Sequence, residues 1–118
     1  MKSLFLALLS VLCLALTTAS AQAAWAVAQP SGGGQPFIQR FRLEADARQT
    51  VLDACRARYG ECKVVMSGDS GCVATAITGS KWGVGKGGNQ KRADAAALSA
   101  CEKLGAGACR IEIQFCGQ

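Results

Sequence analysis

The hydrophobic and polar positions of the chain predict the same four elements twice. Short runs that are apolar, or that alternate apolar with polar residues, predict strands, whereas apolar positions at helical spacing predict helices. The first set has strands at 25–28 and 37–41, a helix at 43–60 and a strand at 62–66. The second set has strands at 72–77 and 81–86, a helix at 90–104 and a strand at 109–116. Each half is therefore β-β-α-β, and the expected fold is α+β, with up to six strands and two helices.

The second half also repeats the sequence of the first. A shift of 46 positions superimposes several residues without a gap, namely Val73 on Val27, Ala74 on Ala28, Ala93 on Ala47, Leu98 on Leu52 and Cys101 on Cys55. One inserted residue then aligns Cys109 with Cys62. We therefore expect a single motif present twice, in repeats of about 25–70 and 71–118.

The second helix is expected to lie unusually close to whatever element it packs on, because its buried stripe is made mostly of small side chains. This stripe consists of Ala93, Ala97, Ala100, Cys101 and Leu104. Asn89 is the expected N-cap of the helix and Gly105 its expected stop. In the last strand, Ile111, Ile113 and Phe115 alternate with polar residues and are expected to point inward.

The first 23 residues differ in character from this pattern. Lys2 precedes an apolar run at 4–16, and Ala21 and Ala23 form a small-residue cleavage site, which together predict a secretory signal peptide. An uncleaved membrane anchor is the alternative, but the run is shorter than the roughly 20 residues that a spanning helix needs. With cleavage after residue 23 or 24, we expect a single domain at 24–118, without a transmembrane segment, in the periplasm or outside the cell.

The cysteines predict a disulfide framework. Beyond the predicted leader there are six, Cys55, Cys62, Cys72, Cys101, Cys109 and Cys116. An even number in a short exported chain favours disulfides over free thiols or a metal site. Each repeat places one cysteine near the end of its helix and another at the start of the following strand, so we expect the pairs Cys55–Cys62 and Cys101–Cys109. The remaining pair, Cys72–Cys116, is then expected to tie the two halves together.

The tandem layout resembles a known family. The matching segments are WAVA at 25–28, LDACRARYGECKVV at 52–65, CVATAI at 72–77, WGVG at 82–85 and ADAAALSACEKLGAGACRIEI at 93–113. Together they resemble the exported bacterial family catalogued as domain of unknown function 4189. The strand FIQRF at 37–41 departs from that pattern, in which a strand rich in glycine and aromatic residues is usual. The resemblance implies a small, exported, disulfide-linked protein and carries no established activity.

Charge and glycine content bear on possible ligands. Once Lys2 is removed from the 13 basic residues, 12 basic and 8 acidic residues remain, and the net charge is +4. This charge is too small and too evenly spread to indicate nucleic-acid binding.

The segment at 83–88 matches GxGxxG, but it follows no buried parallel-strand pattern and no ribose-binding acid lies about 20 residues further on. We therefore expect a glycine-rich strand and turn, and no cofactor.

Enzymatic activity is not expected. The chain has no histidine, which is the commonest general base and metal ligand, and no CxxC motif that would favour a metal site. Its carboxylates are scattered, and the even cysteine count leaves no thiol for nucleophilic catalysis. We therefore predict no catalytic and no metal-binding residues, with a hydrolase of unknown substrate as the weakest alternative.

One cluster remains as a candidate contact edge. It combines cations with an aromatic side chain and consists of Lys81, Trp82, Lys86, Lys91 and Arg92. The leading hypothesis is a non-catalytic binding protein, such as an inhibitor or immunity-type protein, that acts on a protein in the periplasm or outside the cell. The alternative is an envelope-surface module that binds an anionic glycan or lipid through this basic edge. An ordinary solvated edge beside a core tryptophan would account for the same residues.

Overall fold

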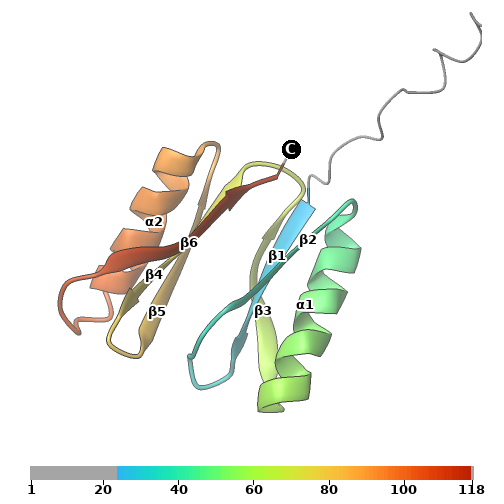
Figure 1. Cartoon of the computed structure of the whole chain (residues 1–118), viewed down its shortest axis with the longest axis horizontal. Helices are drawn as coiled ribbons and strands as arrows, with labels where there is room; N and C mark the ends of the chain where they lie inside the picture. Colours follow the sequence, from blue (N-terminus) through green and yellow to red (C-terminus); the bar gives the residue numbers. More distant parts are fainter. Residues whose placement is uncertain (1–23, 118) are drawn as a thin grey trace, which may run out of the picture.

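The computed structural model describes residues 24–117, so the predicted signal peptide lies outside the described residues. Its elements follow the predicted order (Figure 1). They are β1 (Ala24–Pro30), β2 (Phe37–Phe41), α1 (Glu44–Tyr59), β3 (Cys62–Gly68), β4 (Cys72–Thr78), β5 (Lys81–Gly87), α2 (Gln90–Glu102) and β6 (Arg110–Cys116). The described chain therefore has the expected α+β fold, with the β-β-α-β order present twice.

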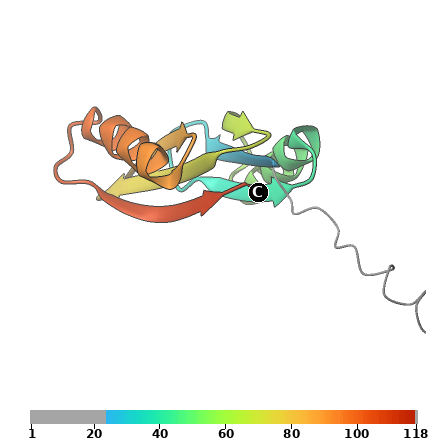
Figure 2. The ribbon, with the colours of Figure 1, turned by 90° about the horizontal axis from the view of Figure 1, so that it is seen from above.

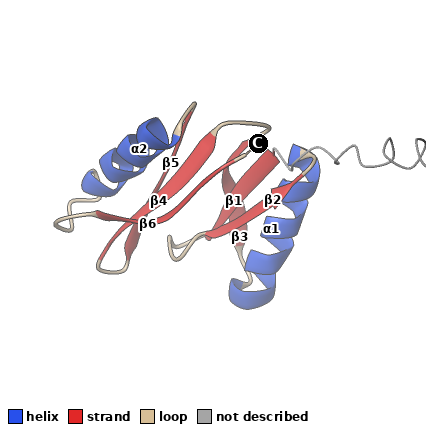
Figure 3. Cartoon of the chain, turned by 45° about the horizontal axis from the view of Figure 1, so that its top comes forward, coloured by secondary structure: helices blue, strands red, loops and turns tan. Residues whose placement is uncertain are grey.

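Each repeat forms its own three-stranded antiparallel sheet. The strand orders are β2-β1-β3 in the first half and β5-β4-β6 in the second, so the first strand of each repeat is central. The two sheets lie next to each other, and the helices α1 and α2 lie on the two outer sides (Figures 1 and 3). The fold is thus a stack of helix, sheet, sheet and helix.

The alternation of side chains between the two faces of β1 and β4 explains this layered arrangement. The alanines of β1, such as Ala26 and Ala28, face α1 and pack against its buried residues Ala47, Val51 and Cys55. In the second half, the equivalent cluster against α2 contains Cys72, Ala74, Ala76, Ala93, Ala97 and Cys101. The residues in between point the other way, and Trp25, Val27 and Val73 form a third cluster that joins the two sheets. Because successive strand side chains point to opposite faces, one strand contributes to two cores.

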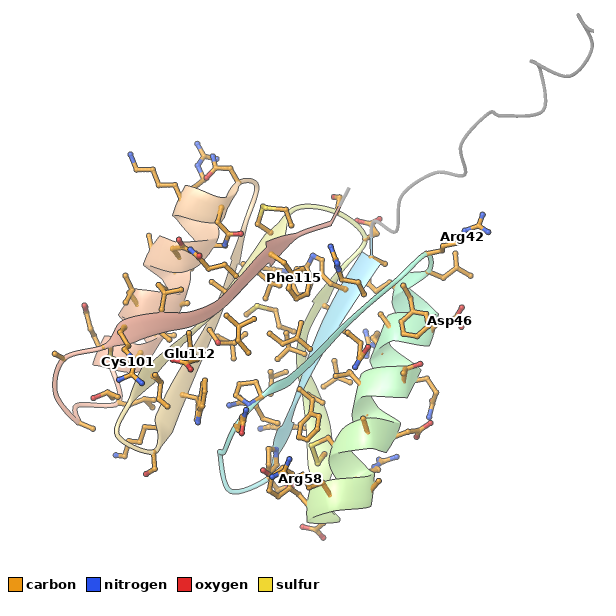
Figure 4. The ribbon with its side chains drawn as sticks, in the orientation of Figure 1. Arg42, Asp46, Arg58, Cys101, Glu112 and Phe115 are labelled. Carbon is orange, nitrogen blue, oxygen red and sulfur yellow. A yellow bond between two sulfur atoms is a disulfide. The ribbon has the colours of Figure 1, made fainter. Side chains whose placement is uncertain are left out.

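The outer strands of the two sheets lie opposite one another across the core. Phe115 of β6 points into the space between the sheets (Figure 4), and the Arg40 guanidinium of β2 lies 5.2 Å from the centre of its ring. Seen from above, β2 and β6 run along the same side of the molecule (Figure 2). On the other side β3 lies opposite β5. Each half therefore presents its second strand to the third strand of the other half.

The three disulfides are Cys55–Cys62, Cys101–Cys109 and Cys72–Cys116, the same pairs that the sequence predicts. The role expected for Cys72–Cys116 was wrong. Both cysteines belong to the second half, where they are direct partners in the register of β4 and β6. This disulfide therefore links β4 to β6 within the second sheet. The two halves are joined by the core between the sheets and by the connecting chain.

Two details of the second half also differ from expectation. Asn89 caps α2 as predicted, since its side chain accepts a hydrogen bond from the Arg92 backbone N–H at 2.9 Å. The helix ends at Glu102, however, and Leu104 is 42% exposed instead of buried. The chain turns away here because Gly105, with φ 70°, leads into the loop that brings Cys109 back to Cys101.

The last strand changes face at an irregularity. Its register with β4 shifts between Thr75 and Ala76. As a result, Ile111 packs in the cluster against α2, whereas Phe115 packs in the cluster between the sheets. The predicted alternation of β6 is present, but its inward residues serve two cores.

Candidate functional site

The glycines of β5 have a packing role. Gly83 and Gly85 face α2, and a Cβ atom on either would lie within 3.0 Å of the helix backbone at Ala97. A Cβ on Gly87 would similarly meet Arg92 and Ala93. Since real Cβ atoms do not approach backbone so closely, these positions require glycine. The GxGxxG pattern is thus accounted for by the close approach of α2 to β5. The alanine stripe of the helix predicts close packing but not which strand is the partner.

The structure separates the predicted contact edge into parts. Lys81 and Lys86 lie toward opposite ends of β5, roughly 16 Å apart at the ordinary rise of a strand. The side chains of Trp82 and Lys86 lie on the face of β5 that is turned toward the other sheet. Lys91 and Arg92 are exposed in the first turn of α2. The five residues therefore do not form one compact cluster.

A groove lies at the end of the molecule where Lys81 and Trp82 are found, between the two halves. It has a volume of about 520 Å³. Half-buried Trp82 lines it together with Pro30, Val65 and Leu104, and the cations Lys63 and Lys81 complete its lining with the turn at 31–33. We call it the Trp82 groove. It brings together residues from both sheets and from the chain after α2.

The Trp82 groove carries unbalanced positive charge. The Lys81 ammonium donates a hydrogen bond to the Leu104 carbonyl oxygen at 3.4 Å, just beyond the C-terminal end of α2. Lys63 is exposed, and within residues 24–117 neither lysine has a carboxylate oxygen within 4.0 Å. No aspartate or glutamate is among the residues that line the groove. An anionic group would therefore be attracted to this site.

Two other hollows have balanced charge. One lies between α1 and β3 and is lined by Glu44 as well as Arg48. The other lies beside Trp25 and is lined by Asp69 as well as Lys86. Trp25 itself is 1% exposed, and its indole N–H donates to the Ser70 carbonyl oxygen at 3.0 Å. Trp25 is thus a core residue, whereas Trp82 is available to a ligand.

Sequence reasoning identified Lys81 and Trp82 but missed the rest of the groove. Lys63, Leu104 and the turn at 31–33 lie far from them along the chain, and only the packing of the two sheets brings them together. Leu104 was assigned to the buried stripe of the helix, so its exposure was not foreseen.

Among residues 24–117, no group of three or more His, Cys, Asp or Glu side chains is placed to hold a metal ion. No helix in the same range is long and apolar enough to cross a membrane.

The fold and its cysteines define the class of the protein. Two β-β-α-β halves, each with a disulfide from its helix to a cysteine at or just before the start of its third strand, make a small disulfide-linked α+β protein. The chain belongs to the family described as Domain of unknown function (DUF4189), whose model matches residues 23–116. Comparison with curated proteins and with solved structures gave no match. The family membership agrees with the resemblance seen in the sequence and supplies no activity.

Proposed function

We propose that this is an exported, non-catalytic binding protein that holds a protein partner at the Trp82 groove, in the manner of an inhibitor or immunity-type protein. The observation that carries the proposal is the groove itself, which is lined by a half-buried tryptophan and by two lysines, with no acid among its lining residues. Tryptophan is enriched among the residues that dominate binding energy in protein interfaces, and unpaired cations favour an acidic partner.

The disulfides support the same proposal. The groove is lined by segments close to Cys62 and to Cys101–Cys109, so its walls are covalently tied to the ends of both helices. A rigid surface loses less conformational entropy on binding than a flexible one. Disulfides also persist mainly in oxidising compartments, which supports a location in the periplasm or outside the cell.

A second candidate is an envelope-surface module that binds an anionic glycan or lipid. The unbalanced charge of Lys63 and Lys81 favours it, because carboxylate, sulfate and phosphate groups would all be attracted there. Its test is binding to acidic oligosaccharides and anionic vesicles by the wild type and by a Lys63→Glu, Lys81→Glu variant. Equal binding by both would remove this candidate. The pair Lys86→Glu, Lys91→Glu tests the remaining cations of the predicted edge in the same way.

Affinity capture tests the leading proposal. The oxidised domain is immobilised and exposed to periplasmic extract and culture medium, with a reduced and unfolded sample as control. We expect a protein that is retained by the folded domain and lost from the Lys63→Glu, Lys81→Glu variant. The matched variant Lys91→Glu, Arg92→Glu removes two exposed cations of α2 outside the groove and should retain it. Absence of any protein enriched over the unfolded control would contradict the proposal.

A further inference from the structure

We propose, resting on the function proposed above, that the partner is recognised through an extended acidic segment that pairs with the free edge of β5 and places its side chains against Trp82. β5 pairs on one side only, with β4. Within the described chain, the backbone N–H and C=O groups along its other side therefore have no strand partner. An extended peptide can add to such an edge, gaining affinity from the backbone and specificity from alternate side chains.

The edge of β5 is better suited to an acidic segment than the other edge beside the groove. β5 contains Lys81 and Lys86 and no acid. β3, on the opposite side of the groove, contributes one cation, Lys63, and near its other end the Ser67 hydroxyl donates to the Glu44 carboxylate at 3.4 Å. An acidic peptide on β5 would therefore meet a lysine of the strand toward each end, whereas on β3 it would meet a lysine at one end and a carboxylate at the other.

The order of side chains along β5 specifies the segment. Trp82, Val84 and Lys86 share the face that turns toward the other sheet. Cross-strand neighbours lie on the same face of a sheet, so the paired peptide would place apolar residues beside Trp82 and Val84 and an acid beside Lys86. A second acid, beyond Trp82, would reach Lys63 and Lys81. We expect the pattern acidic, any, apolar, any, apolar, any, acidic.

The groove combines an apolar wall with polar groups. Pro30, Val65 and Leu104 present carbon atoms to apolar side chains, whereas its lysines and the hydroxyls of Ser31 and Ser80 offer hydrogen bonds to acidic groups. A peptide that carries both apolar and acidic residues would use both kinds of surface.

A random peptide library, displayed and selected on the oxidised protein, tests the segment. Enriched peptides should carry two acids flanking alternate apolar residues, and Trp82→Ala should weaken their binding about 100-fold or more, as for a central anchor residue. Lys81→Glu with Lys86→Glu should weaken it at least about tenfold, through lost charge complementarity. The Lys91→Glu, Arg92→Glu variant should bind as the wild type does. Enriched peptides without acids, or indifference to these substitutions, would overturn the inference.

Strand pairing is tested separately with N-methylated forms of an enriched peptide. Methylation of the alternate amides that face β5 should abolish binding, whereas methylation of the other alternate set should leave it nearly unchanged. Nuclear magnetic resonance should show shifts in the β5 amides and the Trp82 indole, with buried Trp25 as the internal reference. Equal tolerance of both methylated sets would overturn the pairing.

The outcomes separate the two proposals. A captured partner that depends on the groove, but whose peptides never pair with β5, would overturn this inference and leave the proposed function standing. If no peptide is enriched and acidic oligosaccharides shift the Trp82 indole instead, the groove is a glycan site, and both proposals fail.

Discussion

At the residue scale, Thr75 is the one buried polar side chain of the described chain whose hydroxyl has no hydrogen-bond partner. It lies on the same face of β4 as Val73, which packs between the two sheets. Its neighbours across the strands are Val84 and Ile113, which offer no polar group. An unpaired hydroxyl in such a place lowers stability, because its hydration is lost without replacement.

Substitution of Thr75 by valine should therefore stabilise the protein. Valine has nearly the same shape and no group that needs a partner, so we expect the free energy of unfolding to rise by about 1 kcal/mol. Urea unfolding of the oxidised protein measures it. Thr78→Val is the matched control in the same strand, and it should lower stability, because the Thr78 hydroxyl donates to the Ala106 carbonyl oxygen at 3.4 Å. A loss of stability in Thr75→Val would show that this hydroxyl has a partner.

At the element scale, the sequence predicts that α2 packs closely but does not predict that its close partner is β5. The alanine stripe on the helix and the glycines of the strand are complementary, and both follow regular spacings. The end of the helix was less predictable, because it depends on the loop that leads to Cys109 and not on the helical pattern. Leu104 was misassigned for this reason, although it turned out to line the groove.

Substitution of Gly85 by alanine tests this contact. Its Cβ would meet the backbone of α2 near Ala97, and the strand cannot withdraw because it is paired with β4. We expect the free energy of unfolding to fall by about 1–3 kcal/mol through overpacking. Gly88→Ala is the control, since a Cβ there meets nothing within 4 Å, and it should change stability by less than about 0.5 kcal/mol. Equal effects of the two substitutions in thermal unfolding would contradict the close packing.

At the scale of the whole molecule, the repeat predicts the two halves and their disulfides but not how the halves dock. The pairing of Cys55 with Cys62 follows from spacing within one repeat. The Trp82 groove depends instead on which sheet faces meet, a choice made by Trp25, Val27 and Val73 in the core between them. These residues look like ordinary strand residues in the sequence, so neither the docking nor the groove could be predicted.

The disulfides should differ in their contribution to stability. Cys72 and Cys116 are 44 residues apart, whereas Cys101 and Cys109 are 8 apart. On the chain-entropy model, replacing the first pair by alanine should cost about 4 kcal/mol and replacing the second about 2.5 kcal/mol. Urea unfolding of the two double variants gives the comparison. A larger loss for the Cys101–Cys109 variant would contradict the chain-entropy account of these crosslinks.

The central claim is that a protein partner is bound at the Trp82 groove. Its most direct test is the dissociation constant of the captured partner for the wild type, for Trp82→Ala and for the control Lys91→Glu, Arg92→Glu. We predict that Trp82→Ala weakens binding about 100-fold or more, as expected for a central anchor residue, while the control binds like the wild type. An unchanged dissociation constant for a folded Trp82→Ala protein would contradict the claim.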